Sequence, residues 1–247
     1  MVKPLRPSLA IIPARGGSKG LPGKNVRSLA GLPLLAHSLR CAALCPEIDR
    51  TIVSTDSDDV AGVARAYGGD VPFQRPSELA RDDTPMMPVM KHAVEEVERQ
   101  EGRRYETVVL LDPTSPGRIP SDVAAAFAAL TDDATADGAI AVSRPTFNPF
   151  WVGVVERDGA LVPAFETQRT YVRRQDVPVF RRINGSLYVW RRDYVVGHEG
   201  AWHERRHVPI EIPEARAFSI DDLYEFQVAE LLLTSGLLEL PWLTEKR

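Results

Sequence analysis

Residues 8–25 read SLAIIPARGGSKGLPGKN, a short apolar run that leads into a loop rich in glycine. The run Ser8–Pro13 predicts a buried strand, and the glycines after it let backbone amides approach an anion closely. Arg15, Lys19 and Lys24 add three cations to this loop. Because ligands of parallel sheets bind beyond the carboxyl ends of the strands, the stretch predicts an anion-binding site in an α/β fold.

The order of the other elements supports the same fold class. Further strands are expected at Thr51–Thr55, Val71–Gln74, Thr107–Leu111 and Gly138–Ser143, with helices at Leu34–Ala43, from Asp58, from Thr84 or Pro88 to about Arg99, and from a cap at Ser121. Strands that alternate with helices are typical of a mostly parallel, doubly wound sheet. We therefore predict an α/β, Rossmann-like sheet with helices on both faces.

The pattern changes after about residue 145. Trp151–Glu156 and Ala160–Pro163 flank an Arg-Asp-Gly turn typical of a hairpin, a strand follows within Val179–Trp190, and Arg206–Ile212 predicts the last strand. Helical spacing of apolar residues in 224–232 predicts a final helix that ends near Gly236. We expect one domain over residues 1–247, with a small protruding lobe inserted at roughly 145–200.

Composition excludes several classes of partner. The 247 residues carry a formal net charge of −4 and a pI of about 5.8, so no global basic field attracts nucleic acid or an anionic membrane. No apolar stretch has the length of a membrane span. Cys41 and Cys45 are expected to be buried thiols, because two cysteines make no disulfide framework. These features favour a cytoplasmic protein.

The loop matches neither common phosphate-binding pattern. It has no Gly-Lys-Ser/Thr at Walker A spacing and no Gly-x-Gly-x-x-Gly, and its cations argue against a plain NAD-binding domain. A purely structural turn is the alternative. Cations on both rims of a glycine-rich loop favour a triphosphate site.

Six segments in register resemble the acylneuraminate cytidylyltransferases, the CMP-sialic acid synthetase family. They are IIPARGGSKGLPGKN (11–25), VSTDSDDVA (53–61), RPSELARDDTP (75–85), LLDPTSPGR (110–118), RRQDVPVFRRINGSLYVW (173–190) and SIDDLYEFQVAE (219–230). The resemblance implies a nucleotidyltransferase that couples CTP to an acidic sugar and releases pyrophosphate. It also implies Mg²⁺ or Mn²⁺ as cofactor, and a homodimer in which the lobe reaches the partner.

The resemblance also assigns roles to matching residues. Arg15 and Lys24 would bind the triphosphate and act in catalysis. The nucleotide would further contact Ala14, Gly16, Ser18, Asn25, Arg75 and Thr84, with Arg75 helping to recognise cytosine. The sugar would contact Arg174, Arg182, Asn184 and Tyr188, and an arginine fork suits its carboxylate.

Two departures from the family pattern concern the metal. Asp112 stands where the sialic acid enzymes have glutamine, and Ser219 replaces the first of two aspartates, leaving Asp221 with Asp222 beside it. The related CMP-Kdo synthetases resemble this arrangement, so we expect Asp112 and Asp221 to hold the metal. The alternatives are that Asp112 caps the following turn and, as we favour for Asp222, that it caps the last helix.

The departures leave the acceptor open. Legionaminate, pseudaminate, a Kdo-like acid and a phosphonate are alternatives to N-acetylneuraminate. A nucleotide-binding module without catalysis is a further alternative, for which Ser219 is the sole argument.

Overall fold

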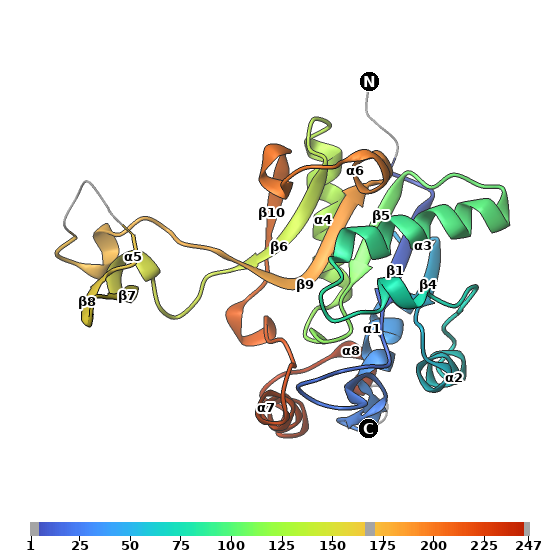
Figure 1. The fold of residues 1–247 in the computed structure, drawn as a ribbon, viewed down its shortest axis with the longest axis horizontal. Helices are drawn as coiled ribbons and strands as arrows, with labels where there is room; N and C mark the ends of the chain where they lie inside the picture. The colour runs from blue at the N-terminus through green and yellow to red at the C-terminus, as the bar shows by residue number, and fades with distance from the viewer. Residues whose placement is uncertain (1–4, 166–170, 245–247) are drawn as a thin grey trace.

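The computed structural model describes residues 5–165 and 171–244, apart from the side chain of Arg174. Its central sheet has six strands in the order β10-β6-β9-β5-β1-β4 (Figure 1). They are β1 (Ser8–Pro13), β4 (Arg50–Ser54), β5 (Thr107–Leu111), β6 (Gly138–Ser143), β9 (Arg182–Arg191) and β10 (His207–Glu211). Only β9 runs antiparallel to its neighbours, which confirms the prediction of a mostly parallel sheet.

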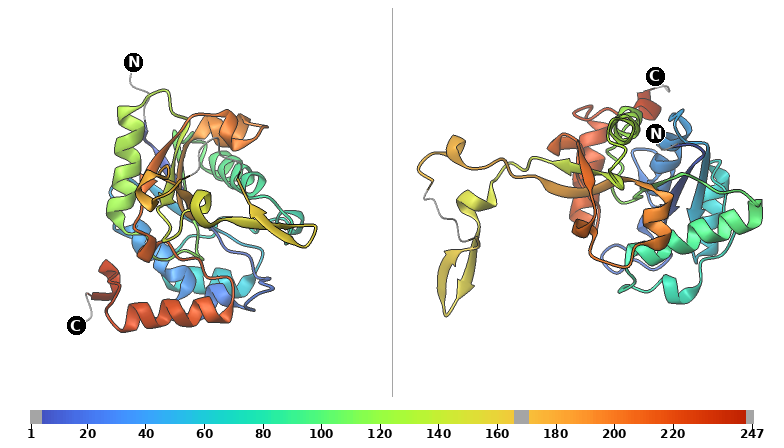
Figure 2. Two further views of the ribbon diagram at one scale, coloured as in Figure 1. Left: turned by 90° about the vertical axis from the view of Figure 1, so that its left-hand side faces the viewer. Right: turned by 90° about the horizontal axis from the view of Figure 1, so that it is seen from above.

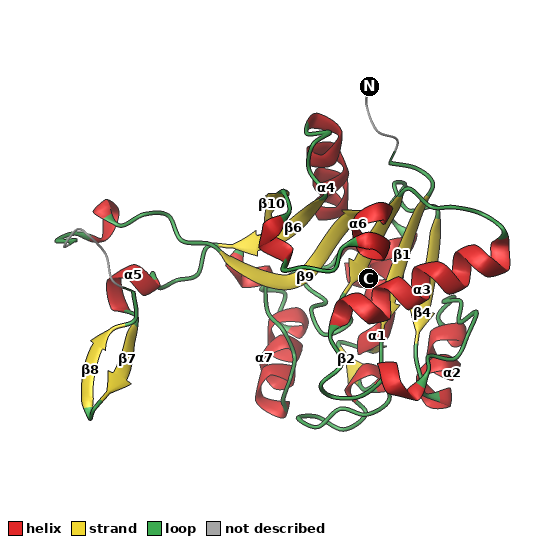
Figure 3. Ribbon diagram, turned by 45° about the horizontal axis from the view of Figure 1, so that its top comes forward, coloured by secondary structure: helices red, strands yellow, loops and turns green. Residues whose placement is uncertain are grey.

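Helices cover both faces of the sheet because each buried strand is apolar on both sides (Figure 3). In β1, Ala10 and Ile12 join one core cluster, whereas Leu9 and Ile11 join the other. The first cluster receives side chains from α1 (Leu34–Ala43), α2 (Asp58–Ala66), α4 (Pro120–Asp132) and α7 (Leu223–Thr234), and the second from α3 (Met86–Glu101) and α6 (Arg192–Gly197). This two-sided packing confirms the doubly wound architecture.

The remaining elements are short. They are β2 (Ser28–Leu29), β3 (Leu32–Pro33), α8 (Pro241–Thr244) and the 3₁₀ turns η1 (Lys24–Val26), η2 (Ser77–Leu79), η3 (Arg174–Asp176), η4 (Trp202–Glu204) and η5 (Glu214–Arg216). Across the described ranges, no helix combines the length and apolar composition needed to cross a membrane.

Two local predictions, one for a strand and one for a helix cap, differ from the structure. The strand expected at Val71–Gln74 is wrong. Asp70 forms an isolated bridge with Ile52 in β4 and Gln74 forms one with Thr55 just after it, and Pro72 between them has no amide to donate. The cap expected at Ser121 is also wrong, because α4 begins at Pro120, a residue suited to the first helical position.

The cap expected for the last helix is confirmed. Asp222 accepts a hydrogen bond from the amide of Glu225 at 2.8 Å, and the Glu225 carboxylate accepts one from the amide of Asp222 at 3.2 Å. This reciprocal pair satisfies two amides at the start of α7.

The chain leaves the sheet between β6 and β9 and forms a lobe that stands away from the main body (Figures 1 and 2). The lobe contains α5 (Pro149–Val152) and the hairpin of β7 (Val154–Arg157) and β8 (Ala160–Pro163), which confirms the predicted hairpin. The projecting part is shorter than the range 145–200, because β9 returns to the centre of the sheet.

A buried histidine fixes the C-terminal segment. His37 in α1 is fully buried, and its Nδ1 accepts a hydrogen bond from the indole of Trp242 at 3.1 Å. Its Nε2 therefore carries the proton and donates to the carbonyl of Leu29 at 2.9 Å. Burial lowers the pKa of His37 from 6.5 to about 4, so the ring is neutral near pH 7.

We predict that this histidine makes the protein less stable in mild acid. Its folded pKa of about 4 lies below its ordinary value of 6.5, so the unfolded chain takes up the proton first. The contribution is complete above about pH 6.5 and falls by at most about 3 kcal/mol as the pH drops to 4. Urea unfolding at pH 7 and pH 5 should show a smaller loss for His37→Gln than for the wild type. The exposed His203→Gln is the control, and an equal loss in all three proteins would contradict the prediction.

Candidate active site

A cavity of about 520 Å³ opens where the glycine-rich loop meets the carboxyl end of β5 and the segment before α7. Four stretches that are far apart in the sequence line it. The lining residues are Pro13, Arg15, Ser18, Lys19, Gly20, Lys24, Asn25, Arg75, Leu79, Arg81, Asp82, Thr84, Met86, Val89, Asp112, Pro113, Thr114 and Asp221. The cavity therefore brings together both predicted catalytic residues, most of the predicted nucleotide contacts and the predicted metal pair.

Glycine is required where the loop packs against the C-terminal segment. A Cβ on Gly20 would lie 2.2 Å from the carbonyl oxygen of Asp221. The loop is tied to its other neighbours through the backbone. Ala14 donates to the carbonyl of Ser54 at 3.0 Å, and Gly16 donates to the carboxylate of Asp56 at 2.9 Å. Ala14 and Gly16 thus hold the loop backbone in place through these hydrogen bonds, and they do not line the cavity.

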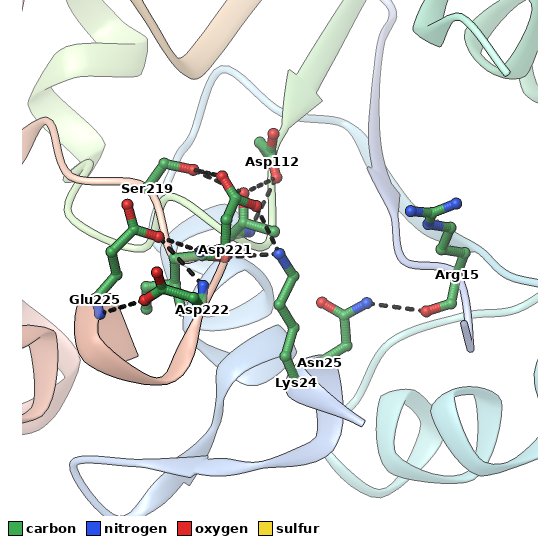
Figure 4. A network of polar contacts seen from close by, with 10 residues as sticks. Arg15, Lys24, Asn25, Asp112, Ser219, Asp221, Asp222 and Glu225 are labelled. Atoms are coloured by element: carbon green, nitrogen blue, oxygen red, sulfur yellow. Dashed lines mark hydrogen bonds and ion pairs between the residues drawn. The ribbon is translucent and has the colours of Figure 1, made fainter. Parts of the chain in front are cut away.

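Lys24 joins the loop to the last third of the chain (Figure 4). Its ammonium group donates to Asp221 Oδ1 at 2.8 Å and to the carbonyl of Ile220 at 2.6 Å. The neighbouring Asn25 donates to the carbonyl of Arg15 at 3.1 Å, while its Oδ1 has no hydrogen-bond partner among the described residues. Both side chains are buried at the wall of the cavity.

The two predicted metal carboxylates face the same cavity from different segments. Asp112 Oδ1 accepts from the amide of Thr114 at 2.9 Å and from its hydroxyl at 2.8 Å, so Asp112 does cap the turn after β5. Its other carboxylate oxygen accepts no hydrogen bond from the described residues. Ser219 links the segments, with its hydroxyl 3.3 Å from Thr114 Oγ1 and 3.5 Å from Asp221 Oδ2.

Arg75 forms part of the cavity wall beneath the loop. Its Nε donates to the hydroxyl of Ser54 at 3.0 Å, and its Nη2 donates to the carbonyl of the same residue. Burial lowers the pKa of Arg75 from 12.5 to about 10, so the guanidinium stays charged at neutral pH. Thr84 also lines the cavity and donates to the carbonyl of Glu78 at 3.2 Å.

The structure adds two charged residues, Arg81 and Asp82, that the sequence did not assign to the site. Asp82 bridges two loop cations, at 2.7 Å from Arg15 Nη1 and 2.6 Å from Lys19 Nζ. Arg81 lines the same cavity and is exposed. Lys19 was visible as a loop cation, and Arg81 and Asp82 lie within the third family-like segment, but their meeting point depends on the fold.

A fully buried guanidinium supports the turn that carries Asp112. Arg118 Nη1 donates to the carbonyls of Asp112 and Ser115, both at 2.7 Å, and to that of Ser186 at 3.0 Å. Its Nη2 donates to the hydroxyl of Ser38. Burial lowers the pKa of Arg118. Arg118 is the last residue of the fourth family-like segment (110–118). Its place in that segment could have marked it as a residue of the site, but the sequence analysis assigned it no role.

A second cavity of about 350 Å³ shares Met86 and Asp112 with the first. Its lining is Met86, Met87, Leu110, Asp112, Ile140, Ile183, Gly185, Tyr188, Trp190, Tyr194 and Trp202. Asp112 is the sole carboxylate among these residues, and four of them are aromatic. Tyr188 is a predicted sugar contact, and burial raises its pKa, with a smaller effect from Asp112.

Two other predicted sugar contacts lie outside these two cavities. Asn184 is buried, donates to Ser143 Oγ at 2.8 Å and accepts from the hydroxyl of Ser186 at 2.7 Å. Arg182 pairs with Glu214 at 3.0 Å. These internal bonds use the polar groups that a sugar would need. The side chain of Arg174 lies outside the described part of the structure.

Comparisons with known proteins identify the family. A profile described as "Cytidylyltransferase" matches residues 9–233. CMP-N,N'-diacetyllegionaminic acid synthase of Legionella pneumophila is 33% identical, over 79% of this chain and 83% of that protein. The synthase of the same name from Campylobacter jejuni is 31% identical, over 92% of this chain and 94% of its own length.

The fold has solved counterparts. A CMP:2-keto-3-deoxy-manno-octonic acid synthetase complexed with CTP superposes with a TM-score of 0.71 at 18% identity, covering 93% of this chain and 99% of that one. Sequence and fold agree with the site geometry and confirm the resemblance noted in the sequence. The chain belongs to the cytidylyltransferase family of nucleotidyltransferases.

Proposed function

We propose that this enzyme transfers CMP from CTP to an acidic, N-acylated sugar of the nonulosonic type and releases pyrophosphate. Two cavities that meet at Met86 and Asp112 are the main support for this proposal. One is lined by cations and the other by aromatic and aliphatic side chains. Two relatives named for an N,N'-diacetyl acid support the choice of acceptor.

The cationic cavity suits the nucleotide. Arg15, Lys19 and Lys24 surround the space beside the loop, where a triphosphate would be neutralised. Arg75 would contact the base, and Thr84 lies on the same wall. In addition, Ser18 lines the cavity, and the loop residues Ala14 and Gly16, whose amides are bonded to neighbouring segments, would hold the backbone that contacts the phosphates.

Asp112 and Asp221 fit a magnesium ion by the chemistry of their donors. Both line the nucleotide cavity, and no cluster of three or more His, Cys, Asp or Glu ligands exists in the described part of the chain. Mg²⁺ is typically held by one or two carboxylates together with substrate phosphates. Bound there, Mg²⁺ or Mn²⁺ would neutralise charge on the phosphate oxygens.

The apolar cavity suits the acceptor's acyl substituents. Acetamido methyl groups pack well on aromatic rings, which Tyr188, Trp190 and Trp202 supply. A Kdo-like acid has hydroxyls where these groups would lie, and it would leave them against rings without enough polar partners. The lining therefore favours an N-acylated acid over a Kdo-like one.

The reaction needs positioning and charge stabilisation more than covalent help from the protein. The anomeric oxygen of the sugar would form a bond to the α-phosphorus while the bond to the β-phosphate oxygen breaks. Arg15 and Lys24 would stabilise the negative charge that gathers on pyrophosphate. Lys24 donates to Asp221 and to Ile220, which leaves the third N–H of its ammonium group for a phosphate oxygen.

We predict that pyrophosphate release requires CTP, Mg²⁺ or Mn²⁺ and an N-acylated nonulosonic acid. A coupled assay with N-acetylneuraminate, diacetyllegionaminate, pseudaminate and Kdo should give kcat/KM values at least about tenfold higher for an acylated acid than for Kdo, since roughly 1.4 kcal/mol of apolar contact suffices. ATP in place of CTP, and excess EDTA, are the controls. Preference for Kdo, or equal use of ATP, would refute the proposal.

We predict that Asp112→Asn raises the Mg²⁺ concentration for half-maximal activity more than it raises the KM of the sugar. Asparagine keeps an oxygen that can accept from Thr114, so the turn should persist while the charge is lost. Calorimetric titration of Mg²⁺ with CTP and protein gives a second measure. Asp222→Asn, which removes the charge beside Asp221 and keeps an oxygen to accept from the amide of Glu225, is the control. An effect on the sugar alone would make Asp112 a specificity residue.

We also propose a homodimer that uses the lobe. The lobe exposes large apolar side chains such as Phe147, Val154 and Leu161, the last 74% exposed. Exposed apolar patches of this kind usually mark contacts between proteins. The hairpin stands away from the body, so a second copy would cover it more readily than the chain itself (Figure 2).

We predict a dimer mass by light scattering at micromolar concentration. Leu161→Glu should shift the protein toward monomer, because dimerisation would bury the new carboxylate. Leu237→Glu, at an equally exposed site after α7, should leave the mass unchanged. A monomeric wild type would rule out the proposal.

A further inference from the structure

Three cations of the nucleotide cavity, Arg15, Lys19 and Lys24, are already paired with carboxylates of the chain. Asp82 places one oxygen 2.7 Å from Arg15 Nη1 and the other 2.6 Å from Lys19 Nζ. On the opposite side of the loop, Lys24 Nζ lies 2.8 Å from Asp221 Oδ1. Asp221 has a second role in the proposed function, whereas Asp82 has none.

The Asp82 pairs contribute little to stability. The side chain of Asp82 is 40% exposed and that of Lys19 is 82% exposed, so water screens the attraction. Ion pairs between exposed side chains of this kind contribute little to the stability of a fold. The hydrogen bond from Lys19 nevertheless keeps the pKa of Asp82 below its ordinary value, so the carboxylate is charged at neutral pH. Stability does not explain the arrangement.

The geometry of Asp82 imitates that of a phosphate. One carboxylate bridges two cations from the same glycine-rich loop, each through a different oxygen. A phosphate group bridges arginine and lysine side chains in the same way. A triphosphate that binds Arg15 and Lys19 must either displace Asp82 or lie beside its charge. Both cases oppose binding, the first by breaking two ion pairs and the second by repulsion.

We propose that Asp82 is a counter-ion that the triphosphate displaces, and that it limits the affinity of the loop for nucleotide and for pyrophosphate. Asp82 lies on the segment between η2 and α3, so its release also frees that segment from the loop. The return of Asp82 to Arg15 and Lys19 would favour departure of pyrophosphate. This inference rests on the proposed function, since it requires CTP to bind at this loop.

The test is equilibrium calorimetry of CTP with Mg²⁺ and without any sugar, so that no turnover occurs. Asp82→Asn keeps the shape of the side chain and removes its charge, and it should bind CTP about three- to tenfold more tightly. Asp83→Asn is the matched control, because Asp83 is exposed, carries the same charge and lines neither cavity. It should change the affinity less than twofold. Inorganic tripolyphosphate should gain as much as CTP, and CMP less.

The outcomes separate the two proposals. Weaker binding of CTP by Asp82→Asn would overturn the inference, because Asp82 would then orient Arg15 and Lys19 for the nucleotide. An equal gain in Asp83→Asn would also overturn it, since a long-range charge effect would suffice. A wild type that binds no CTP would overturn the proposed function itself. Circular dichroism of both variants checks that they are folded.

Discussion

Close packing of the glycine-rich loop against the segment before α7 holds the site together. Gly20 lies so near the Asp221 backbone that no side chain fits between them. This approach lets Lys24 reach the carbonyl of Ile220, 196 positions away in the sequence. One buried lysine therefore connects the N-terminal loop with the segment before α7. Without that contact, the loop cations and Asp221 would have no fixed relation to each other.

The turn after β5 is held by a different interaction, the hydrogen bonds of the buried Arg118. Burying a guanidinium is costly unless its donors are satisfied, and Arg118 places Nη1 and Nη2 on three carbonyl groups and one hydroxyl, while its Nε has no partner among the described residues. One of these carbonyl groups belongs to Asp112 and another to Ser186 in β9. Asp112 thus cannot shift independently of the central antiparallel strand. Strand β9 also contributes Tyr188 and Trp190 to the second cavity, so Arg118 connects the turn that carries Asp112 with the strand that carries these rings.

Much of the fold follows from local patterns in the sequence. Runs such as Ser8–Pro13 and Thr107–Leu111 are apolar throughout because both faces are covered, and the order of elements then indicates the class of sheet. The position of β9 between β5 and β6 does not follow, because a strand's own residues do not specify its partners. The end of the lobe was misjudged for this reason.

Some residues of the candidate site could be predicted from the sequence, and others could not. Residues within the loop motif could be located from spacing and charge, since Arg15 and Lys24 are near each other in the chain. Asp82 and Arg118 could not, because the groups they contact come from other segments. Asn184 was also located from its motif as a predicted sugar contact, whereas its hydrogen bonds to Ser143 and Ser186 depend on the fold and could not be predicted.

The replacement of an aspartate by Ser219 shifts negative charge within the site. Ser219 is neutral and lies between Thr114 and Asp221, whereas Asp112 puts its charge at the border with the apolar cavity. In the proposed reaction, the acceptor's own carboxylate would be repelled from that border unless a cation intervened. No cation lines the described part of the second cavity, whereas Lys19 and Arg81 line the first. The metal ion proposed at Asp112, together with Lys19 and Arg81, would therefore draw the acceptor's carboxylate toward the first cavity, and its acyl groups would lie toward the rings.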